Sequence, residues 1–331
     1  MNPSAAQAQK ARRMAHTGRK VTFGAIYLVE ILRRSLNAAF EHDILTVGQA
    51  TAYSAMVALF PALIVAAAFV GLLPETVPLR LQLAVFFDRI LPSNVSPLLD
   101  AYFGSSHHNP QTARALLGSV VVSITGAASV MATLMEGFRR AHDLPLERKS
   151  FWQRRVRALT LVPLSLVPMS LASALVVFGH FMTAWMAGKM ATPLQAPVYV
   201  IAFLVRWSMA LAGSVGIIAV IYHLGTDLTK HMREHMEPWL ALRMDWSWRA
   251  SLPGAMVATG LWFVTTLCFG FYVTKFANYS QVYGSLGAAI ALMFWLYIIA
   301  LSVLIGSEFN AQLNLDRRKL HQRPPETPSD R

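Results

Sequence analysis

The feature that most constrains the fold is an apolar run near the end of the chain, within residues 276–313, FANYSQVYGSLGAAIALMFWLYIIALSVLIGSEFNAQL. Crossing a hydrocarbon core of about 30 Å takes about 20 predominantly apolar residues in helical form, and this run is long enough. It ends on Gly306, Glu308 and Asn310, and a basic tail follows. A soluble domain has no use for so long an apolar segment, so the run predicts a membrane-spanning helix.

The composition extends this prediction to the whole chain. Of the 331 residues, 55% are hydrophobic and only 14% are charged, whereas about 25% are charged in a soluble domain. Six apolar runs predict spans near 48–73, 114–137, 157–182, 200–224, 251–274 and 283–307. The expected fold is therefore all-α, a polytopic membrane protein with a bundle of six transmembrane helices and amphipathic interfacial helices.

Three parts of the chain are expected on this basis. Residues 1–20 are polar and basic and predict a disordered cytoplasmic arm without a cleavable signal peptide. Residues 21–313 form the transmembrane domain, and residues 314–331 form a disordered cytoplasmic tail. The connection 74–113 carries an amphipathic segment that is expected to rest on the outer face.

The transmembrane domain is expected to begin with an amphipathic helix over residues 21–42. Its apolar stripe is Leu28, Ile31, Leu32, Leu36, Ala39 and Phe40, opposite Glu30, Arg33, Arg34, Asn37 and Glu41. The helix is too polar to span a bilayer. It either lies along the cytoplasmic membrane surface or packs against other cytoplasmic segments, and the sequence leaves both alternatives open.

Lys and Arg residues are distributed unevenly between alternate loops. Arg157 is counted with the loop before its span, and Arg114 and Arg206 are left out because they fall at or inside spans. On this basis, the two termini and the loops on their side of the membrane carry 23 Lys and Arg residues, and the loops on the opposite side carry 4. Because positive residues stay in the cytoplasm, both termini are expected to be cytoplasmic, in a bacterial inner membrane.

The net charge of +12 indicates partners as well as orientation. Because the basic residues flank the apolar runs, the expected partners are membrane lipids, with anionic headgroups favoured, rather than nucleic acid. No cofactor or metal is expected: Cys268 is the only cysteine, and His231 and His235, one helical turn apart, have no evident third ligand. The oligomeric state is left open.

Polar residues at membrane depth are the best candidates for function, and Arg206 is the sharpest case. Arg206 lies inside the bilayer if its span begins near Pro197, and serves as an interface anchor if the span begins near Leu204. The sequence slightly favours the anchor. Glu136 and Glu308 fall near cytoplasmic ends of spans, where ion pairs with Arg139, Arg140 or Arg317 are expected.

The last span also carries a family resemblance. The run Phe276-Ala277-Asn278-Tyr279-Ser280 and the following Tyr283-Gly284-Ser285-Leu286-Gly287 resemble the signature of the YihY/virulence factor BrkB family. The pattern continues in Trp295-Leu296-Tyr297 and in Gly306, Glu308 and Asn310, and the first span adds Ala52-Tyr53 and Leu59-Phe60-Pro61. The chain departs from the pattern at Ser54, Ala58 and Lys275.

The resemblance implies six membrane helices with cytoplasmic termini, and an association with envelope integrity and serum resistance. It supplies no settled activity. Members have been labelled ribonuclease BN, but a metal-dependent nuclease of that kind should show an H-x-H-x-D-H cluster, and the chain has no histidines two apart. The sequence therefore predicts that the nuclease label is misapplied and that the protein is not an enzyme.

Two functions compete on the sequence. The first is a transporter or lipid-translocating protein of the cell envelope, because broken, small-residue-rich helices around polar groups build substrate paths. Its candidate path residues are Tyr53, Pro61, Arg206, Asn278, Tyr279, Tyr283, Gly284, Ser285, Gly287, Glu308 and Asn310. The second is a non-transporting membrane scaffold with envelope protein partners, in which the same residues only lock helices together.

Overall fold

The protein is all-helical in the part of the chain that its structure, a computed structural model, describes. The described residues are 27–71, 110–144, 150–166, 183, 192–226, 248–275 and 286–321. The helices are α2 (Ile44–Gly71), α5 (Pro110–Ala141), α7 (Thr192–Gly225), the 3₁₀ turn η1 (Trp248–Ser251), α10 (Leu252–Lys275) and α12 (Leu286–His321). Residues 27–41 and 151–166 are also helical.

Five of the described helices are long and apolar enough to cross a membrane, namely α2, α5, α7, α10 and α12. They correspond to five of the six expected spans. The expected third span, 157–182, is described only as far as residue 166, which is helical, so the count of six stays a prediction. The amphipathic segment expected in the connection 74–113 lies outside the described residues.

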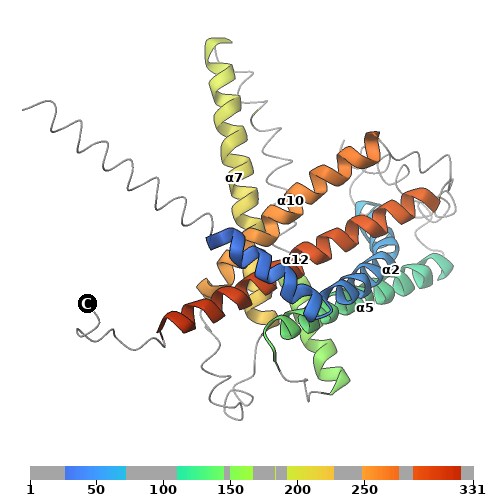
Figure 1. The fold of residues 1–331 in the computed structure, drawn as a ribbon. Helices are drawn as coiled ribbons and strands as arrows, with labels where there is room; N and C mark the ends of the chain where they lie inside the picture. Colours follow the sequence, from blue (N-terminus) through green and yellow to red (C-terminus); the bar gives the residue numbers. More distant parts are fainter. Residues whose placement is uncertain are drawn as a thin grey trace, which may run out of the picture.

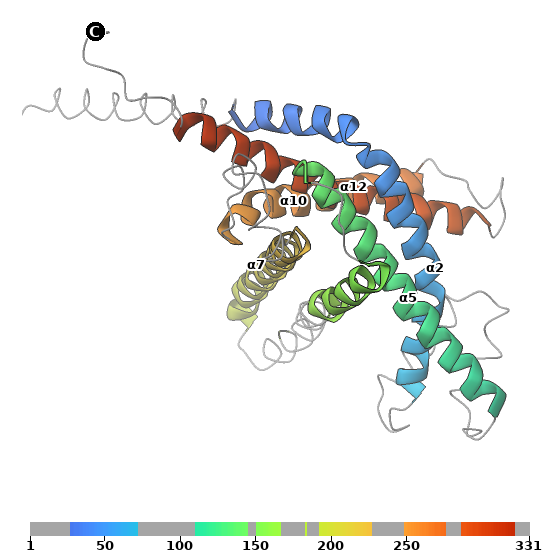
Figure 2. The ribbon, with the colours of Figure 1, turned by 90° about the horizontal axis from the view of Figure 1, so that it is seen from below.

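The buried core lies at one end of the helices. At this end α2 and α10 begin, α5 and α7 end, and α12 runs past them (Figures 1 and 2). We refer to this end of the helices as the joined end. The core cluster there consists of Ala39, Ile44, Val47, Phe138, Ile218, Ala219, Tyr222, Ala255, Ala258 and Leu304. From the joined end, α7 diverges from α10 and α12 (Figures 1 and 2). Its first half therefore leaves large apolar side chains exposed, among them Ile201 and Leu204.

The helix over residues 27–41 packs along the last part of α12. Ile31 is fully buried against Phe309 and Leu313, and Arg34 Nη1 lies 3.2 Å from Asp316 Oδ1. The structure thus shows the packed alternative for this helix. Its partner α12 continues to His321 instead of ending at residue 313, where the tail was expected to begin.

Part of the apolar stripe of this helix faces away from the protein. Leu28, Leu36 and Phe40 are exposed, although the sequence pattern placed them on the same stripe as Ile31. The buried face is completed by Ser35, Ala38 and Ala39. The stripe is therefore wider than the face that α12 covers.

Small residues let the helices approach closely. On α10, a Cβ added to Gly254 would lie 2.1 Å from the carbonyl oxygen of Gly306 on α12. Between α5 and α2, a Cβ added to Gly126 would lie 2.5 Å from the Cβ of Ala58. Because α10 and α12 meet backbone to backbone at Gly254 and Gly306, neither position has room for a side chain.

Candidate functional site

A fully buried carboxylate lies at the joined end. Glu308 on α12 is 0% exposed, and its Oε1 lies 2.8 Å from Nδ1 of His42. The other ring nitrogen of His42, Nε2, lies 3.4 Å from Oδ1 of Asp143. His42 therefore bridges two carboxylates, one buried and one at the surface, which suits an imidazolium donating from both nitrogens.

The electrostatics favour the charged form of His42. Its hydrogen bond with Glu308 raises the pKa of the His42 imidazole, and Asp143 adds to the rise. A buried carboxylate without a counter-charge would cost several kcal/mol, so the imidazolium compensates it. The second carboxylate oxygen, Oε2 of Glu308, is buried and has no hydrogen-bond partner among the described residues.

The local fold places His42 by a tight turn between two helices. Helix 27–41 ends there, and Asp43 adopts a left-handed backbone with φ of 56°, a conformation that Asp tolerates better than most residues. Oδ1 of Asp43 accepts a 2.7 Å hydrogen bond from the hydroxyl of Thr46 in the first turn of α2. Because Asp43 both turns the chain and caps α2, His42 is directed toward α12.

A similar turn follows α5. The chain again reads His-Asp, at His142 and Asp143, and Asp143 also has a positive φ, 51°. The two turns differ in their partners: Nδ1 of His142 lies 2.9 Å from the carbonyl oxygen of Phe138. Burial lowers the pKa of His142, whereas the hydrogen bond with Glu308 raises that of His42, so the two His-Asp turns shift their imidazoles in opposite directions.

Asn310 joins α12 to the start of α10. Its Oδ1 accepts a 2.7 Å hydrogen bond from the amide of Gly254, and its Nδ2 donates to the carbonyl oxygen of Ser251 at 3.1 Å. The amide of Gly254 lies in the first turn of a helix, where it lacks an intrahelical partner. On the neighbouring helix α7, the hydroxyl of Tyr222 donates to the carbonyl oxygen of Val303 on α12. These bonds hold α7, α10 and α12 together.

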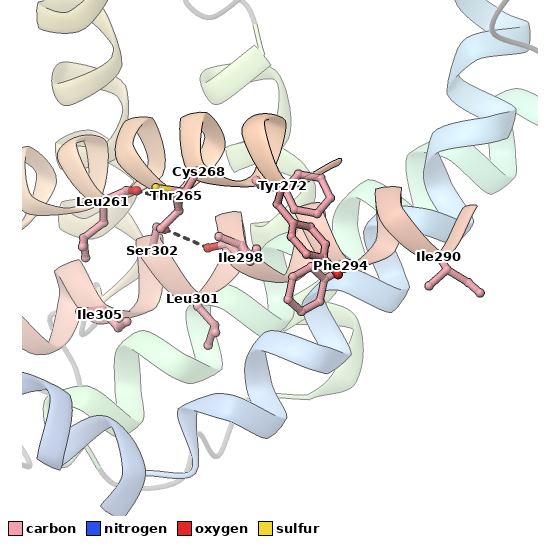
Figure 3. A pocket seen from close by; sticks show the side chains of 11 residues that line it. Leu261, Thr265, Cys268, Tyr272, Ile290, Phe294, Ile298, Leu301, Ser302 and Ile305 are labelled. Carbon is pink, nitrogen blue, oxygen red and sulfur yellow. Dashed lines mark hydrogen bonds between the residues drawn. The ribbon is translucent and has the colours of Figure 1, made fainter. Parts of the chain in front are cut away.

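An apolar groove lies along α10 and α12 and extends away from the joined end (Figure 3). It has a volume of about 700 Å³ and is lined by Leu261, Thr265, Cys268, Phe269, Tyr272, Ile290, Phe294, Ile298, Leu301, Ser302 and Ile305. From Ile290 to Ile305 the groove follows α12 over 15 residue-to-residue steps, a helical rise of about 22 Å. This length is most of the thickness of a hydrocarbon core, about 30 Å.

Two hydroxyl groups in the groove, those of Thr265 and Ser302, are turned to their own helices. The hydroxyl of Thr265 donates to the carbonyl oxygen of Leu261 at 2.6 Å, and that of Ser302 to the carbonyl oxygen of Ile298 at 2.9 Å. The rest of the groove lining is largely hydrocarbon. The groove consequently offers an apolar lining that suits an alkyl chain better than a hydrated solute.

The residues predicted for a substrate path lie in different parts of the structure. Glu308 and Asn310 come together with His42 and Gly254 at the joined end, as described above. Tyr53 is 66% exposed, while Pro61 is half-buried within α2 and Gly287 is buried in the first turn of α12. None of these residues lines the groove. The predicted residues Asn278, Tyr279, Tyr283, Gly284 and Ser285 lie outside the described residues.

Arg206 lies near the middle of α7 and does not join either feature. It is half-buried, and its Nε has no hydrogen-bond partner in the described part of the chain. It precedes Gly225, where α7 ends, by 19 residues, or about 28 Å of helix. Its role as an anchor or an intramembrane charge stays a prediction.

The sequence prediction for the two glutamates is half right. Glu136 lies 3.4 Å from Nε of Arg140, as expected. The partner of Glu308 is His42, which sequence reasoning missed, because 266 residues separate the two in the chain. The missed signal is the His-Asp pair that directly follows the amphipathic helix. No group of three His, Cys, Asp or Glu residues within the described ranges could hold a metal ion.

Comparisons with known proteins place the chain among bacterial membrane proteins. It is 26% identical over 277 residues to the putative ribonuclease-like protein YfkH of Bacillus subtilis, covering 84% of this chain and 91% of that one. It is 24% identical to a UPF0761 membrane protein of Ralstonia nicotianae over 88% of this chain, but the match spans only 60% of that longer protein. No solved structure matches.

The match to a family model is nearly complete. The model described as virulence factor BrkB covers residues 35–331, which include α2, α5, α7, α10 and α12 and both features described above. With five helices able to cross a membrane, the chain is an integral, multi-pass membrane protein. It belongs to the virulence factor BrkB family.

Proposed function

We propose that this protein moves a lipid, or another substrate with an alkyl chain, across the bacterial inner membrane. The observation that carries the proposal is the apolar groove between α10 and α12, about 700 Å³ in volume and about 22 Å long. An alkyl chain lying in this groove is shielded on one side by protein and remains parallel to the membrane-spanning helices. The groove ends at Ile305, one turn before the buried Glu308.

The distribution of burial supports this proposal. The core lies at the joined end, whereas the far half of α7 leaves apolar side chains uncovered. With both termini in the cytoplasm, the joined end faces the cytoplasm and the groove extends from it toward the opposite side of the membrane. A groove that starts at a packed end and continues along the spanning helices suits a carrier in one of its two states.

The test is lipid movement in proteoliposomes that contain the native chain and headgroup-labelled phospholipid. Thr265→Leu places extra methyl groups in the groove, and its neighbour Val264→Leu is the matched control, because Val264 is exposed and does not line the groove. Because the added methyl groups take space that an alkyl chain would fill, we expect the Thr265→Leu rate to fall roughly tenfold, a barrier about 1.4 kcal/mol higher, and the Val264→Leu rate to stay near native. A native protein that moves no labelled lipid or alkyl-bearing solute under any gradient would overturn the proposal.

The second candidate is a non-transporting scaffold of the cell envelope. It is favoured by the joined end itself, where Asn310, Tyr222 and His42 bond to neighbouring helices and lock them together. A scaffold would keep its envelope function when the groove is filled. Serum resistance of cells that carry Thr265→Leu therefore separates the two candidates: transport predicts its loss, and a scaffold predicts that it is retained.

A nuclease activity is not part of the proposal, although the name of the Bacillus subtilis relative is ribonuclease-like. Purified protein is expected to cleave RNA no faster than a mock preparation from cells without the gene. Cleavage that survives purification and is lost in a variant of this chain would contradict this expectation.

A further inference from the structure

A second, more polar pocket lies between α5 and the helix over residues 151–166. It has a volume of about 350 Å³. Its apolar lining comes from Ala132, Met135 and Phe151, with Thr133 beside them. Its charged lining is Arg139, Arg154 and Arg155, with one carboxylate, Glu136. We call this the arginine pocket.

The charges in the arginine pocket favour an anion. Glu136 already lies 3.4 Å from Nε of Arg140, outside the pocket. Arg155 is held in place without a carboxylate, since its Nη2 donates to the carbonyl oxygen of Thr125 at 3.2 Å and its guanidinium lies 5.7 Å from the ring centre of Phe151. The exposed side chain of Arg154 has no partner in the part of the chain that the structure describes. Within the described residues, Arg154 and Arg155 therefore bring positive charge to the pocket without a paired carboxylate.

The end of a helix adds to this positive potential. The helix over residues 151–166 begins at the pocket, and the amide of Ser150 donates to Oε1 of Gln153 at 3.3 Å. The first amides of a helix and its dipole favour an anion near its N-terminus. Arg154 and Arg155 lie within that first turn or next to it, so side chains and backbone act in the same direction.

We propose that the arginine pocket binds a phosphate group, carried either by an anionic phospholipid or by a free phosphate anion. Guanidinium groups pair with phosphate through two parallel hydrogen bonds, and Arg154 and Arg155 supply the donors. The apolar side of the pocket, at Ala132 and Met135, gives the first acyl carbons of a phospholipid a place to lie. Basic pockets between membrane helices on the cytoplasmic side recognise lipid headgroups by this chemistry. The proposal does not depend on transport, because a bound lipid can also hold α5 against the helix over residues 151–166.

The test titrates delipidated protein in neutral detergent and follows its thermal unfolding. The three probes are phosphatidylglycerol, phosphatidylcholine and inorganic phosphate. We expect saturable stabilisation by phosphatidylglycerol, and an apparent affinity about tenfold weaker in Arg154→Gln, because a hydrogen bond to a charged group is lost. Arg154→Lys keeps the charge and should restore part of the affinity. Arg154 is exposed, so these variants are expected to fold.

Arg249→Gln is the matched control, since it removes the same charge from an exposed position at the joined end but outside the pocket. Its affinity should stay within twofold of native, a difference of about 0.4 kcal/mol. Saturation by inorganic phosphate alone would identify a free anion as the ligand, and a response to phosphatidylglycerol alone would identify a lipid. The proposal fails if phosphatidylcholine binds as well as phosphatidylglycerol, if neither anionic probe binds, or if Arg249→Gln weakens binding as much as Arg154→Gln.

Discussion

Among single residues, Glu308 is the one whose surroundings matter most to stability. Its carboxylate is fully buried, and the imidazolium of His42 is its counter-charge at 2.8 Å. Replacing His42 by Ala leaves this carboxylate uncompensated, which costs about 3 kcal/mol when a buried pair is broken. We expect the free energy of unfolding, measured in detergent, to fall by that amount.

His223→Ala is the control for this substitution, because His223 is exposed at the same end of the molecule and changes there typically stay within about 0.5 kcal/mol. Equal losses in the two variants would show that the His42–Glu308 pair has no special role.

The same pair predicts a pH dependence of stability. The pKa of His42 is raised in the folded protein above its unfolded value of about 6.5. Its contribution is therefore fully present below pH of about 6.5 and is lost as the pH rises through the raised pKa. The stability difference between the native protein and His42→Gln should be largest in mildly acidic buffer and shrink toward alkaline pH. A difference that grows with pH would contradict this assignment.

At this scale the sequence could identify Glu308 and Asn310 as polar residues placed at the end of an apolar run, but it could not identify their partners. His42 is 266 residues from Glu308 in the chain, and Gly254 is 56 residues from Asn310. A local pattern contains no information on which distant segment a side chain will meet. The arginines near Glu308 in the sequence were the natural expectation, and for Glu136, whose partner is one turn away, the same reasoning succeeded.

Between helices, the tightest contact is the crossing of α10 and α12 at Gly254 and Gly306. A Cβ at Gly254 would meet a carbonyl oxygen at 2.1 Å, and backbone cannot move aside as a side chain can. Gly254→Ala should therefore destabilise the protein by several kcal/mol, as overpacking of a tight contact does. The measurement is the thermal unfolding of the purified variant.

Gly260→Ala, on the same helix, is the control because a Cβ there meets nothing within 4 Å. Ala is favoured over Gly in a helix by up to about 1 kcal/mol, so this variant should be as stable as the native protein or more so. If both variants unfold alike, the close approach of α10 and α12 does not hold in the protein.

The helices themselves were largely predictable. Apolar runs of sufficient length gave five of the spans to within several residues, because length and hydropathy alone decide whether a segment suits a bilayer. The ends were less predictable. Helix α12 extends to His321 because helix 27–41 covers it through Ile31 and Arg34, and such support between distant segments cannot be seen in a local window.

For the whole molecule, the testable property is its orientation. In a Cys268→Ser background, Ser150→Cys and Arg249→Cys place single thiols at the joined end, and Thr192→Cys places one at the start of α7. The distribution of Lys and Arg predicts cytoplasmic termini, and on that prediction a membrane-impermeant maleimide should label only the Thr192→Cys protein in intact spheroplasts. The other two should react only after the membrane is opened. The reverse labelling pattern would show that the protein is inserted the other way.

The contact between helix 27–41 and α12 also has a consequence for how the protein is made. Arg34 and Asp316 are separated by 282 residues, so at 5–20 residues per second roughly 15 to 60 s of translation pass before the partner of the first helix exists. Until then the apolar face around Ile31 has no protein to cover it, and Glu308 has not yet reached His42. A ribosome that stops before the last span would release a chain with an uncovered face at its N-terminus. Quality-control proteases could recognise that face as the mark of an unfinished product.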